Sequence, residues 1–298
     1  PYKNSFIKYG RIFIFIEKFI ISQIIRGCKM KLTVLVDNNT IIDEYYVGEP
    51  GLSFYIEDGN KKILFDLGYS NVFIDNMKKM NISSSEVDVL VISHGHDDHV
   101  GGIKYLANKK LNPNLKIIGH TLVFNKKVKN NQCISSPLEI NEIKHMGEVY
   151  LSKEPIKISE NIYFLGEIPS IIDFEPRYSI GEIERDNKYE EDFIYDDTAL
   201  VYKSKEGLFI IAGCSHSGIC NIVEHAKKVC NDNRIIGIIG GTHLRECNER
   251  VEKTLKYFKN NNIKNLYLCH CTSFEAKSYI NTSIPMKEVG VGLKVEID

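Results

Sequence analysis

The chain has 298 residues, of which 43% are hydrophobic and 26% are charged, and its 38 basic and 39 acidic side chains nearly balance. This content excludes a disordered chain, which lacks the apolar residues that offset the entropy of folding. A net charge of -1 provides no global field that attracts nucleic acid or anionic lipid, so we expect neither as a partner. Length and composition indicate one large globular domain or two small ones.

The eight Cys stand at irregular positions, and no C-x-x-C pair occurs among them. In a chain of this length, that pattern favours reduced, mostly buried thiols over a disulfide framework. We therefore expect a cytoplasmic protein with free cysteines.

Residues 1–29 differ in character from the rest of the chain. The stretch 12–25 is apolar, but a Glu-Lys pair interrupts it, so it is too short for a membrane span. It also lacks the unbroken apolar region and the small-residue cleavage site of a secretory signal. Two alternatives are left: an amphipathic helix, or a translated leader upstream of a start at Met30. Codons for the residues just before Met30 can resemble a ribosome-binding site, which favours the leader and a domain spanning 30–298.

From Met30 onward, short β-rich runs alternate with segments of helical spacing. An Asp-Gly-Asn turn signal joins the second and third runs into a hairpin. The predicted strands are 31–36, 52–56, 62–67, 87–92, 198–203, 207–212, 235–239, 265–269 and 293–297, and the predicted helices are 71–80, 219–229 and 249–258. Strands come first in each half and helices alternate with strands afterwards, which fits two sheets packed face to face with helices outside.

Between the two halves, residues 125–197 are richer in polar residues, Pro and charge. We expect this segment to be an insertion or lid and not part of the core. Lys126, Lys127 and Lys129 are expected on its solvated face, because a run of Lys is usually solubilising. A phosphate-binding role for these lysines is the alternative.

Several residues of the types that bind metal ions follow the buried strand 87–92. The sequence S-H-G-H-D-D-H-V-G-G places three His and two Asp within six positions, residues 94–99. Imidazoles and carboxylates are costly to bury unpaired, and together they form the ligand set of Zn²⁺, Mn²⁺ or Fe²⁺. In an extended segment His94 and His96 share a face and can bind one ion, while the turn at Asp98 and His99 directs these two residues at a second.

This H-x-H-x-D-H motif resembles that of the metallo-β-lactamase superfamily. The segment Phe-Asp-Leu-Gly at 65–68 is similar to the superfamily's first motif, in which the Asp, here Asp66, orients a ligating His. Further segments are similar to the branch named 7,8-dihydropterin-6-yl-methyl-4-(β-D-ribofuranosyl)aminobenzene 5'-phosphate synthase: 166–169, Asp197, 213–218, 240–244 and 269–272. The resemblance runs from Met30 to the C-terminus. It implies an α/β fold, an αββα sandwich of two mixed sheets with helices outside, and a two-metal site at one edge.

The resemblance also implies a ligand set. His94 and His96 would hold the first metal, and Asp98, His99 and His270 the second. The superfamily usually supplies a further His and a bridging Asp after a strand and a Gly, but here Cys214 and then His216 follow the strand at 207–212. Either His216 is the missing His and water bridges the metals, or the Cys214 thiolate also binds. We favour His216, because a Cys in such a place is more often buried and inert.

Other residues are candidates for roles around the metals. His243, in a Gly-Gly-Thr-His loop after a strand, is a candidate acid, base or oxyanion partner, with a structural hydrogen-bonding role as the alternative. His120 is a candidate on the substrate side, and Asp66, Cys214 and Asp197 are expected around the ligands or at the substrate. Asp98 is expected to bind metal and to orient the nucleophile.

These residues predict an enzyme with two divalent metal ions, zinc first and manganese or iron as alternatives, and a small-molecule substrate. The first hypothesis is a hydrolase that activates water against a small anionic ester or phosphoester. The second is a transferase that condenses a dihydropterin diphosphate with an arylamine ribose 5'-phosphate, as the branch name implies. A non-catalytic metal sensor is the third. The sequence leaves the oligomeric state open.

Overall fold

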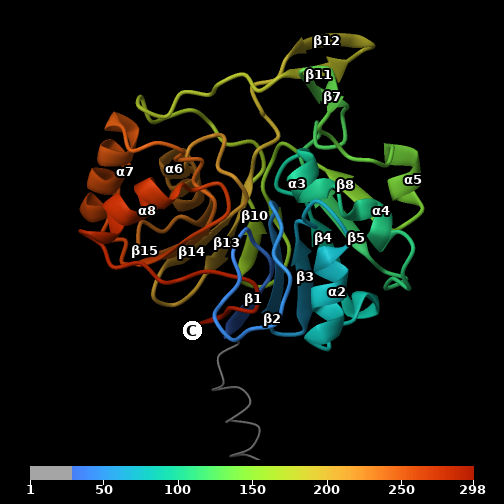
Figure 1. Ribbon diagram of the computed structural model, residues 1–298, viewed down its shortest axis with the longest axis horizontal. Helices are drawn as coiled ribbons and strands as arrows, with labels where there is room; N and C mark the ends of the chain where they lie inside the picture. The colour runs from blue at the N-terminus through green and yellow to red at the C-terminus, as the bar shows by residue number, and fades with distance from the viewer. Residues whose placement is uncertain (1–28) are drawn as a thin grey trace, which may run out of the picture.

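The structure, a computed structural model, describes residues 29–298 (Figure 1). The predictions for residues 1–28 lie outside the described residues. In the described part of the chain, no helix is long and apolar enough to cross a lipid bilayer. The described cysteines, seven in number, are all free, and four of them are buried.

Two large mixed sheets form the centre of the molecule. The first has the order β17 (Lys294–Ile297), β1 (Met30–Val36), β2 (Ser53–Asp58), β3 (Lys61–Phe65), β4 (Val89–Val91), β5 (Lys116–Gly119) and β8 (Glu148–Leu151). The second has the order β16 (Asn265–Leu268), β15 (Ile235–Gly240), β14 (Leu208–Ala212), β13 (Ala199–Lys203), β10 (Ile162–Phe164) and β9 (Ile156–Lys157). Each sheet combines an antiparallel hairpin part with a parallel part reached through helical crossovers.

Helices cover the outer faces of the two sheets, as Figure 1 shows. On the first sheet lie α2 (Val72–Lys79), a 3₁₀ turn (Ser84–Glu86), α3 (Asp97–Val100), α4 (Ile103–Leu106) and α5 (Ile140–Lys144). On the second lie α6 (Ile219–Cys230), α7 (Glu249–Asn260) and α8 (Phe274–Asn281). Helix α6 buries Ile219, Ile222, Val223 and Ala226, which stand at the spacing of one helix face.

Three separate hydrophobic clusters correspond to the three interfaces between these four layers. One joins the inner faces of the two sheets and includes Phe54, Phe65 and Phe209. The second packs α2, α4 and α5 on the first sheet, and the third packs α6, α7 and α8 on the second. The predicted αββα sandwich is therefore confirmed. Every strand and helix predicted from the sequence is present, with ends that differ by at most two residues.

The predicted insertion at 125–197 is divided between two structures. Its outer parts form a third, four-stranded sheet of β12 (Lys188–Glu191), β11 (Glu182–Arg185), β6 (Lys127–Lys129) and β7 (Gln132–Cys133), which projects from the sandwich at the top of Figure 1. The middle part supplies β8, β9 and β10 to the two main sheets. The segment is thus not a single lid, because its middle strands complete the core.

Lys127 corrects the sequence prediction for the lysine run. Lys126 and Lys129 are exposed as expected, but Lys127 is fully buried. Its ammonium group lies 2.7 Å from Asp192 Oδ2 and 2.8 Å from Asp196 Oδ1. Burying a charged side chain costs free energy, because the charge loses its hydration, unless opposite charges compensate it. The two aspartates provide that compensation.

Candidate metal centre

Loops from four strand ends meet at one site. The loop 93–99 follows β4, 213–218 follows β14 and 269–272 follows β16. The end of β1 joins them, because the backbone N–H of His270 donates to Asp37 Oδ1 at 2.9 Å. Ligands in parallel sheets collect at the carboxyl ends of strands, and the arrangement here follows that rule.

A cluster of three histidines forms one half of the site. His94, His96 and His216 are buried, and one ring nitrogen of each lies within 4.8 Å of the others. His94 Nε2 is 3.1 Å from His96 Nδ1, so the two side chains share a face as the alternation of an extended segment predicts. We call this group the three-histidine cluster.

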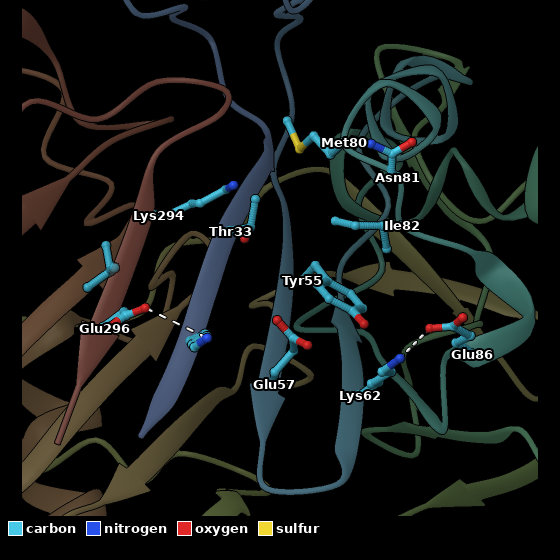
Figure 2. A pocket seen from close by; sticks show the side chains of 12 residues that line it. Thr33, Tyr55, Glu57, Lys62, Met80, Asn81, Ile82, Glu86, Lys294 and Glu296 are labelled. Atoms are coloured by element: carbon cyan, nitrogen blue, oxygen red, sulfur yellow. Dashed lines mark hydrogen bonds and ion pairs between the residues drawn. The ribbon is translucent and has the colours of Figure 1, made fainter. Parts of the chain in front are cut away.

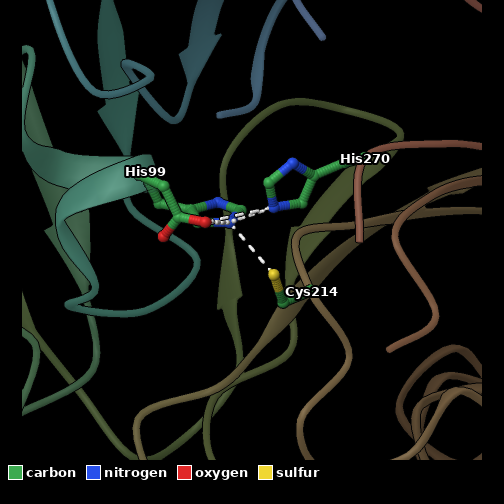
Figure 3. Close-up of side chains that lie close together, drawn as sticks. His99, Cys214 and His270 are labelled. Atoms are coloured by element: carbon green, nitrogen blue, oxygen red, sulfur yellow. Dashed lines mark hydrogen bonds and ion pairs between the residues drawn. The ribbon is translucent and has the colours of Figure 1, made fainter. Parts of the chain in front are cut away.

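A mixed cluster forms the other half (Figure 3). It consists of Asp98, His99, Cys214 and His270, whose ligand atoms also lie within 4.8 Å of one another. His99 Nε2 is 3.1 Å from both Cys214 Sγ and His270 Nε2, and His270 Nε2 is 3.3 Å from Asp98 Oδ2. Although burial opposes it, His99 and His270 lower the pKa of Asp98 below its ordinary value, so the carboxylate is charged.

The side chains of the three-histidine cluster fit a metal ion. Burial, and then the charge of Lys127, lower the pKa of His96 to about 4, and burial lowers that of His94 and His216. These imidazoles are neutral at pH 7, which is the form that binds metal. Within the described chain, Nε2 of His96 and of His216 is buried without a hydrogen-bond partner. A bound cation would provide the missing partner for these two buried nitrogens.

The two clusters adjoin. The ring centroids of His94 and His99 are 4.3 Å apart, although the two residues belong to different clusters. The sequence left a choice between His216 and Cys214 as a ligand. In the structure both take part, His216 in the three-histidine cluster and Cys214 in the mixed cluster. At the place where the resemblance leads us to expect a bridging Asp, the structure has the Cys214 thiol.

Carboxylates and an amide orient the ligands from behind. Asp66 Oδ2 lies 2.7 Å from His99 Nδ1, as expected for the first motif. Asn38 Oδ1 lies 2.9 Å from His270 Nδ1, and Asp37 accepts the His270 backbone N–H. Such partners fix the tautomer and the ring orientation. Asp37 and Asn38 are not predicted from the sequence, in which their only signal is a polar pair directly after a buried strand.

Asp197 supports the site without lining it. The carboxylate is fully buried, and its Oδ2 accepts hydrogen bonds from the backbone N–H and the hydroxyl of Ser217. Asp197 thereby holds the loop that carries Cys214 and His216. Burial raises the pKa of this carboxyl group.

His120 lies away from the ligand clusters. Its side chain is fully buried, its Nε2 is 3.1 Å from Glu167 Oε2, and its Nδ1 accepts the backbone N–H of Leu122. Both ring nitrogens are therefore used within the protein. The structure gives His120 a structural hydrogen-bonding place and not one at the cavity.

A cavity of about 600 Å³ opens above both clusters. Its floor contains ligand-cluster residues, and its rim carries Tyr69, Lys129 and Arg245. The residues that line it are Asn38, Pro50, Tyr69, His96, Asp97, Asp98, Lys129, Ile134, Ile180, Cys214, His216, His243, Arg245, His270 and Cys271. The four-stranded sheet contributes Lys129 directly, so this part of the predicted insertion does border the site.

His243 lies at the junction of this cavity with a neighbouring one of about 490 Å³. Its ring centroid is 4.3 Å from that of His216, and its Nε2 has no partner in the described chain. Burial, and then the charges of Arg245 and Arg250, lower the pKa of His243 to about 3. A neutral imidazole of this kind donates or accepts a hydrogen bond but is a poor proton donor to a leaving group at pH 7.

A further hollow, of about 440 Å³, lies on the outer face of β17, β1 and β2 (Figure 2). None of its lining residues belongs to either cluster. Of its charged side chains, Lys31 pairs with Glu296 and Lys62 with Glu86, which leaves only Glu57 and Lys294 without an ion pair in the described part of the chain. This surface therefore offers no comparable set of unpaired groups.

The model of the metallo-beta-lactamase superfamily matches residues 46–220, which is more than half of the chain. The chain belongs to this superfamily. Among curated proteins it is 31% identical over 264 residues to the 7,8-dihydropterin-6-methyl-4-(beta-D-ribofuranosyl)-aminobenzene-5'-phosphate synthase of Methanocaldococcus jannaschii, covering 84% of this chain and 90% of the relative. It is 34% identical over 250 residues to an uncharacterized protein of the same archaeon, covering 82% and 91%.

Solved structures of the metallo-beta-lactamase superfamily match as well. Tm1679, described as a metal-dependent hydrolase of the beta-lactamase superfamily, is 28% identical with a TM-score of 0.76, over 90% of this chain and 99% of that one. YhfI from Bacillus subtilis is 13% identical with a TM-score of 0.53, over 90% and 99%, and shows the fold alone. The branch expected from the sequence is thereby confirmed.

Proposed function

We propose that this metallo-beta-lactamase superfamily member is an enzyme that uses two divalent cations against a small anionic substrate. The three-histidine cluster would hold one cation, and the mixed cluster the other. The observation that carries the proposal is the contact of the two clusters beneath a single cavity, with His94 and His99 rings 4.3 Å apart. Zinc is the first candidate, because imidazole and thiolate ligands suit Zn²⁺, and the thiolate makes Mn²⁺ less favourable than Fe²⁺.

When bound, the cations would supply Lewis-acid chemistry, lowering the pKa of water and polarising a substrate oxygen. Asp98 is one-third exposed, so besides binding metal it can accept a hydrogen bond from the attacking group and orient it. His243 lines the cavity, and its buried Nε2 has no hydrogen-bond partner among the described residues. We assign it hydrogen bonding to the substrate oxygen that gains charge.

Two cations at the rim support an anionic substrate. Lys129 and Arg245 both line the cavity, and neither makes an ion pair or side-chain hydrogen bond with the rest of the described protein. The guanidinium of Arg245 can bind a phosphate or carboxylate through two parallel hydrogen bonds, and Lys129 adds a point charge.

Hydrolysis of a phosphoester or another small anionic ester is the first candidate reaction, and the similarity to Tm1679, described as a metal-dependent hydrolase, supports it. The test is turnover of a panel of phosphomonoesters, phosphodiesters and lactones by zinc-loaded protein with no acceptor present. Release of product that Asp98→Asn abolishes supports the hydrolase. The absence of turnover on the whole panel counts against it.

Transfer is the second candidate, and the name of the Methanocaldococcus relative favours it. In that reaction the arylamine ribose phosphate would replace water as the acceptor. The test offers a dihydropterin diphosphate with and without the arylamine. Diphosphate release that depends on the arylamine supports transfer, whereas equal release without it returns the assignment to hydrolysis.

A further inference from the structure

Hydrogen bonds hold the loop that carries His94 and His96 in place. They are donated by the backbone N–H groups of alternate residues of this loop. Side chains alternate along an extended segment, so those of His94 and His96 share the face that meets the three-histidine cluster. The three bonds run from the N–H of Ser93 to Asp66 Oδ1 (2.7 Å), from that of Gly95 to Asp196 Oδ2 (2.7 Å) and from that of Asp97 to the Ile134 carbonyl (2.9 Å).

The bond to Gly95 leads into the buried ion network of the four-stranded sheet. Asp196 uses its second oxygen, Oδ1, to bind the Lys127 ammonium at 2.8 Å. Lys127 in turn binds Asp192 Oδ2 at 2.7 Å, and all three side chains are fully buried. At this depth water cannot replace a lost partner, so the geometry of the network is strongly determined.

Gly95 is also packed against this network. A Cβ at Gly95 would lie 2.2 Å from the carbonyl oxygen of Val123 and 2.9 Å from Lys127 Cε. The backbone between the two histidines therefore rests directly on the stem of Lys127, and no larger residue fits there without moving the loop.

We propose that Asp196, anchored by Lys127, is a positioning residue that sets the separation of the His94 and His96 imidazoles. The inference rests on the proposed function, since it concerns the three-histidine cluster as a metal site. It gives Lys127, on β6 of the four-stranded sheet, and the segment that follows β12 a role in metal affinity. Asp196 touches no ligand side chain; it acts through the backbone of Gly95.

Asp192 provides a matched control within the same network. Like Asp196, it is fully buried, binds Lys127 with one oxygen and accepts one backbone N–H, that of Ile194 at 2.9 Å, with the other. Asn in either place has one acceptor oxygen where two are used, and its NH₂ group faces the Lys127 ammonium unfavourably. Asp192→Asn and Asp196→Asn therefore remove the same chemistry, but only Asp196 contacts the metal loop.

The experiment is a cobalt(II) titration of metal-free wild-type protein and both variants. The mixed cluster contains Cys214, so cobalt bound there gives a thiolate-to-cobalt charge-transfer absorption, whereas cobalt in the three-histidine cluster gives only ligand-field bands. Urea unfolding of the metal-free proteins shows whether the two variants are equally destabilised.

We expect Asp196→Asn to weaken cobalt binding at the three-histidine cluster by about tenfold to a hundredfold, as is usual for partners behind metal ligands. The charge-transfer absorption of the mixed cluster and its affinity stay at the wild-type values, and Asp192→Asn leaves both clusters unchanged. Equal affinities in all three proteins overturn the inference, and so does an equal loss in both variants. Wild-type protein that binds no cobalt overturns the proposed function together with the inference.

Gly95→Ala tests the same geometry with every charge in place, should Asp196→Asn fail to fold. The added Cβ must displace the loop from Val123, so the three-histidine cluster again loses affinity while the mixed cluster keeps its charge-transfer absorption. Wild-type affinity in Gly95→Ala overturns the inference.

Discussion

The Cys214 thiol lies in the mixed cluster and would change the chemistry of a metal bound there. Cys214 Sγ lies 3.1 Å from His99 Nε2 and faces the same point as Asp98 and His270. Burial, more than any neighbour, raises the pKa of this thiol without metal. A bound cation would therefore displace the thiol proton, because cysteine binds metal as the thiolate.

His216→Ala and Cys214→Ala are each expected to remove about one metal equivalent, since loss of a ligand residue greatly weakens a metal site. The two losses differ in kind: only Cys214→Ala removes the thiolate-to-cobalt absorption. Metal analysis and absorption spectroscopy measure both effects. Cys220→Ala, which removes a buried thiol outside both clusters, is the control and keeps two metals. If Cys214→Ala kept two full metal equivalents, the thiolate would not be needed as a ligand, and water would be the bridge between the metals.

Arg245→Ala is expected to lower kcat/KM for an anionic substrate by about tenfold to a hundredfold, chiefly through KM, because a hydrogen-bonded ion pair with the substrate is lost. Steady-state kinetics on the charged substrate and on its neutral analogue provide the measurement. The control, Arg234→Ala, removes an exposed guanidinium that already pairs with Asp232. An equal effect on charged and neutral substrates would show that Arg245 does not select for charge.

At the scale of elements, burial decides which parts of the fold can be predicted. Strands β1, β4 and β14 are almost wholly buried, so their runs of Val, Ile and Leu identify them in the sequence. Strand β12 is exposed along its whole length, and β7 has two residues, so neither leaves a pattern. Each pairs with its neighbour in the chain across a short turn, β12 with β11 and β7 with β6. Only the pairing of β11 with β6, which joins the two hairpins into one sheet, depends on residues far apart in the chain.

Phe209 on β14 tests the packing between the two sheets. It is fully buried there, and Phe209→Ala is expected to lower the free energy of unfolding by about 3–5 kcal/mol through lost burial and a residual cavity. Urea unfolding measures the change. Phe274, the first residue of α8, is 81% exposed, and Phe274→Ala should change stability by less than about 0.5 kcal/mol. Similar losses in both variants would contradict the assigned core.

At the scale of the whole molecule, the site joins residues that are distant in sequence. The His and Asp residues at 94–99 are close together in the sequence, so a metal site there can be predicted from residue types alone. The bond from His270 to Asp37 spans 233 positions, and that from Gly95 to Asp196 spans 101. No short pattern encodes such pairs, which explains why Asp37, Asn38 and Asp196 were missed. Lys127 was placed wrongly for the same reason, since its partners lie more than sixty positions away.

The arrangement of two adjoining clusters is tested most directly by counting metal ions per chain. Metal-free protein is loaded with Zn²⁺, passed through a desalting column and weighed by native mass spectrometry, alongside His96→Ala and Asp98→Ala. The structure predicts two zinc ions in the wild-type chain and about one in each variant. Fewer than two ions in the wild-type chain, or two retained in both variants, would contradict the assignment of these clusters as metal sites.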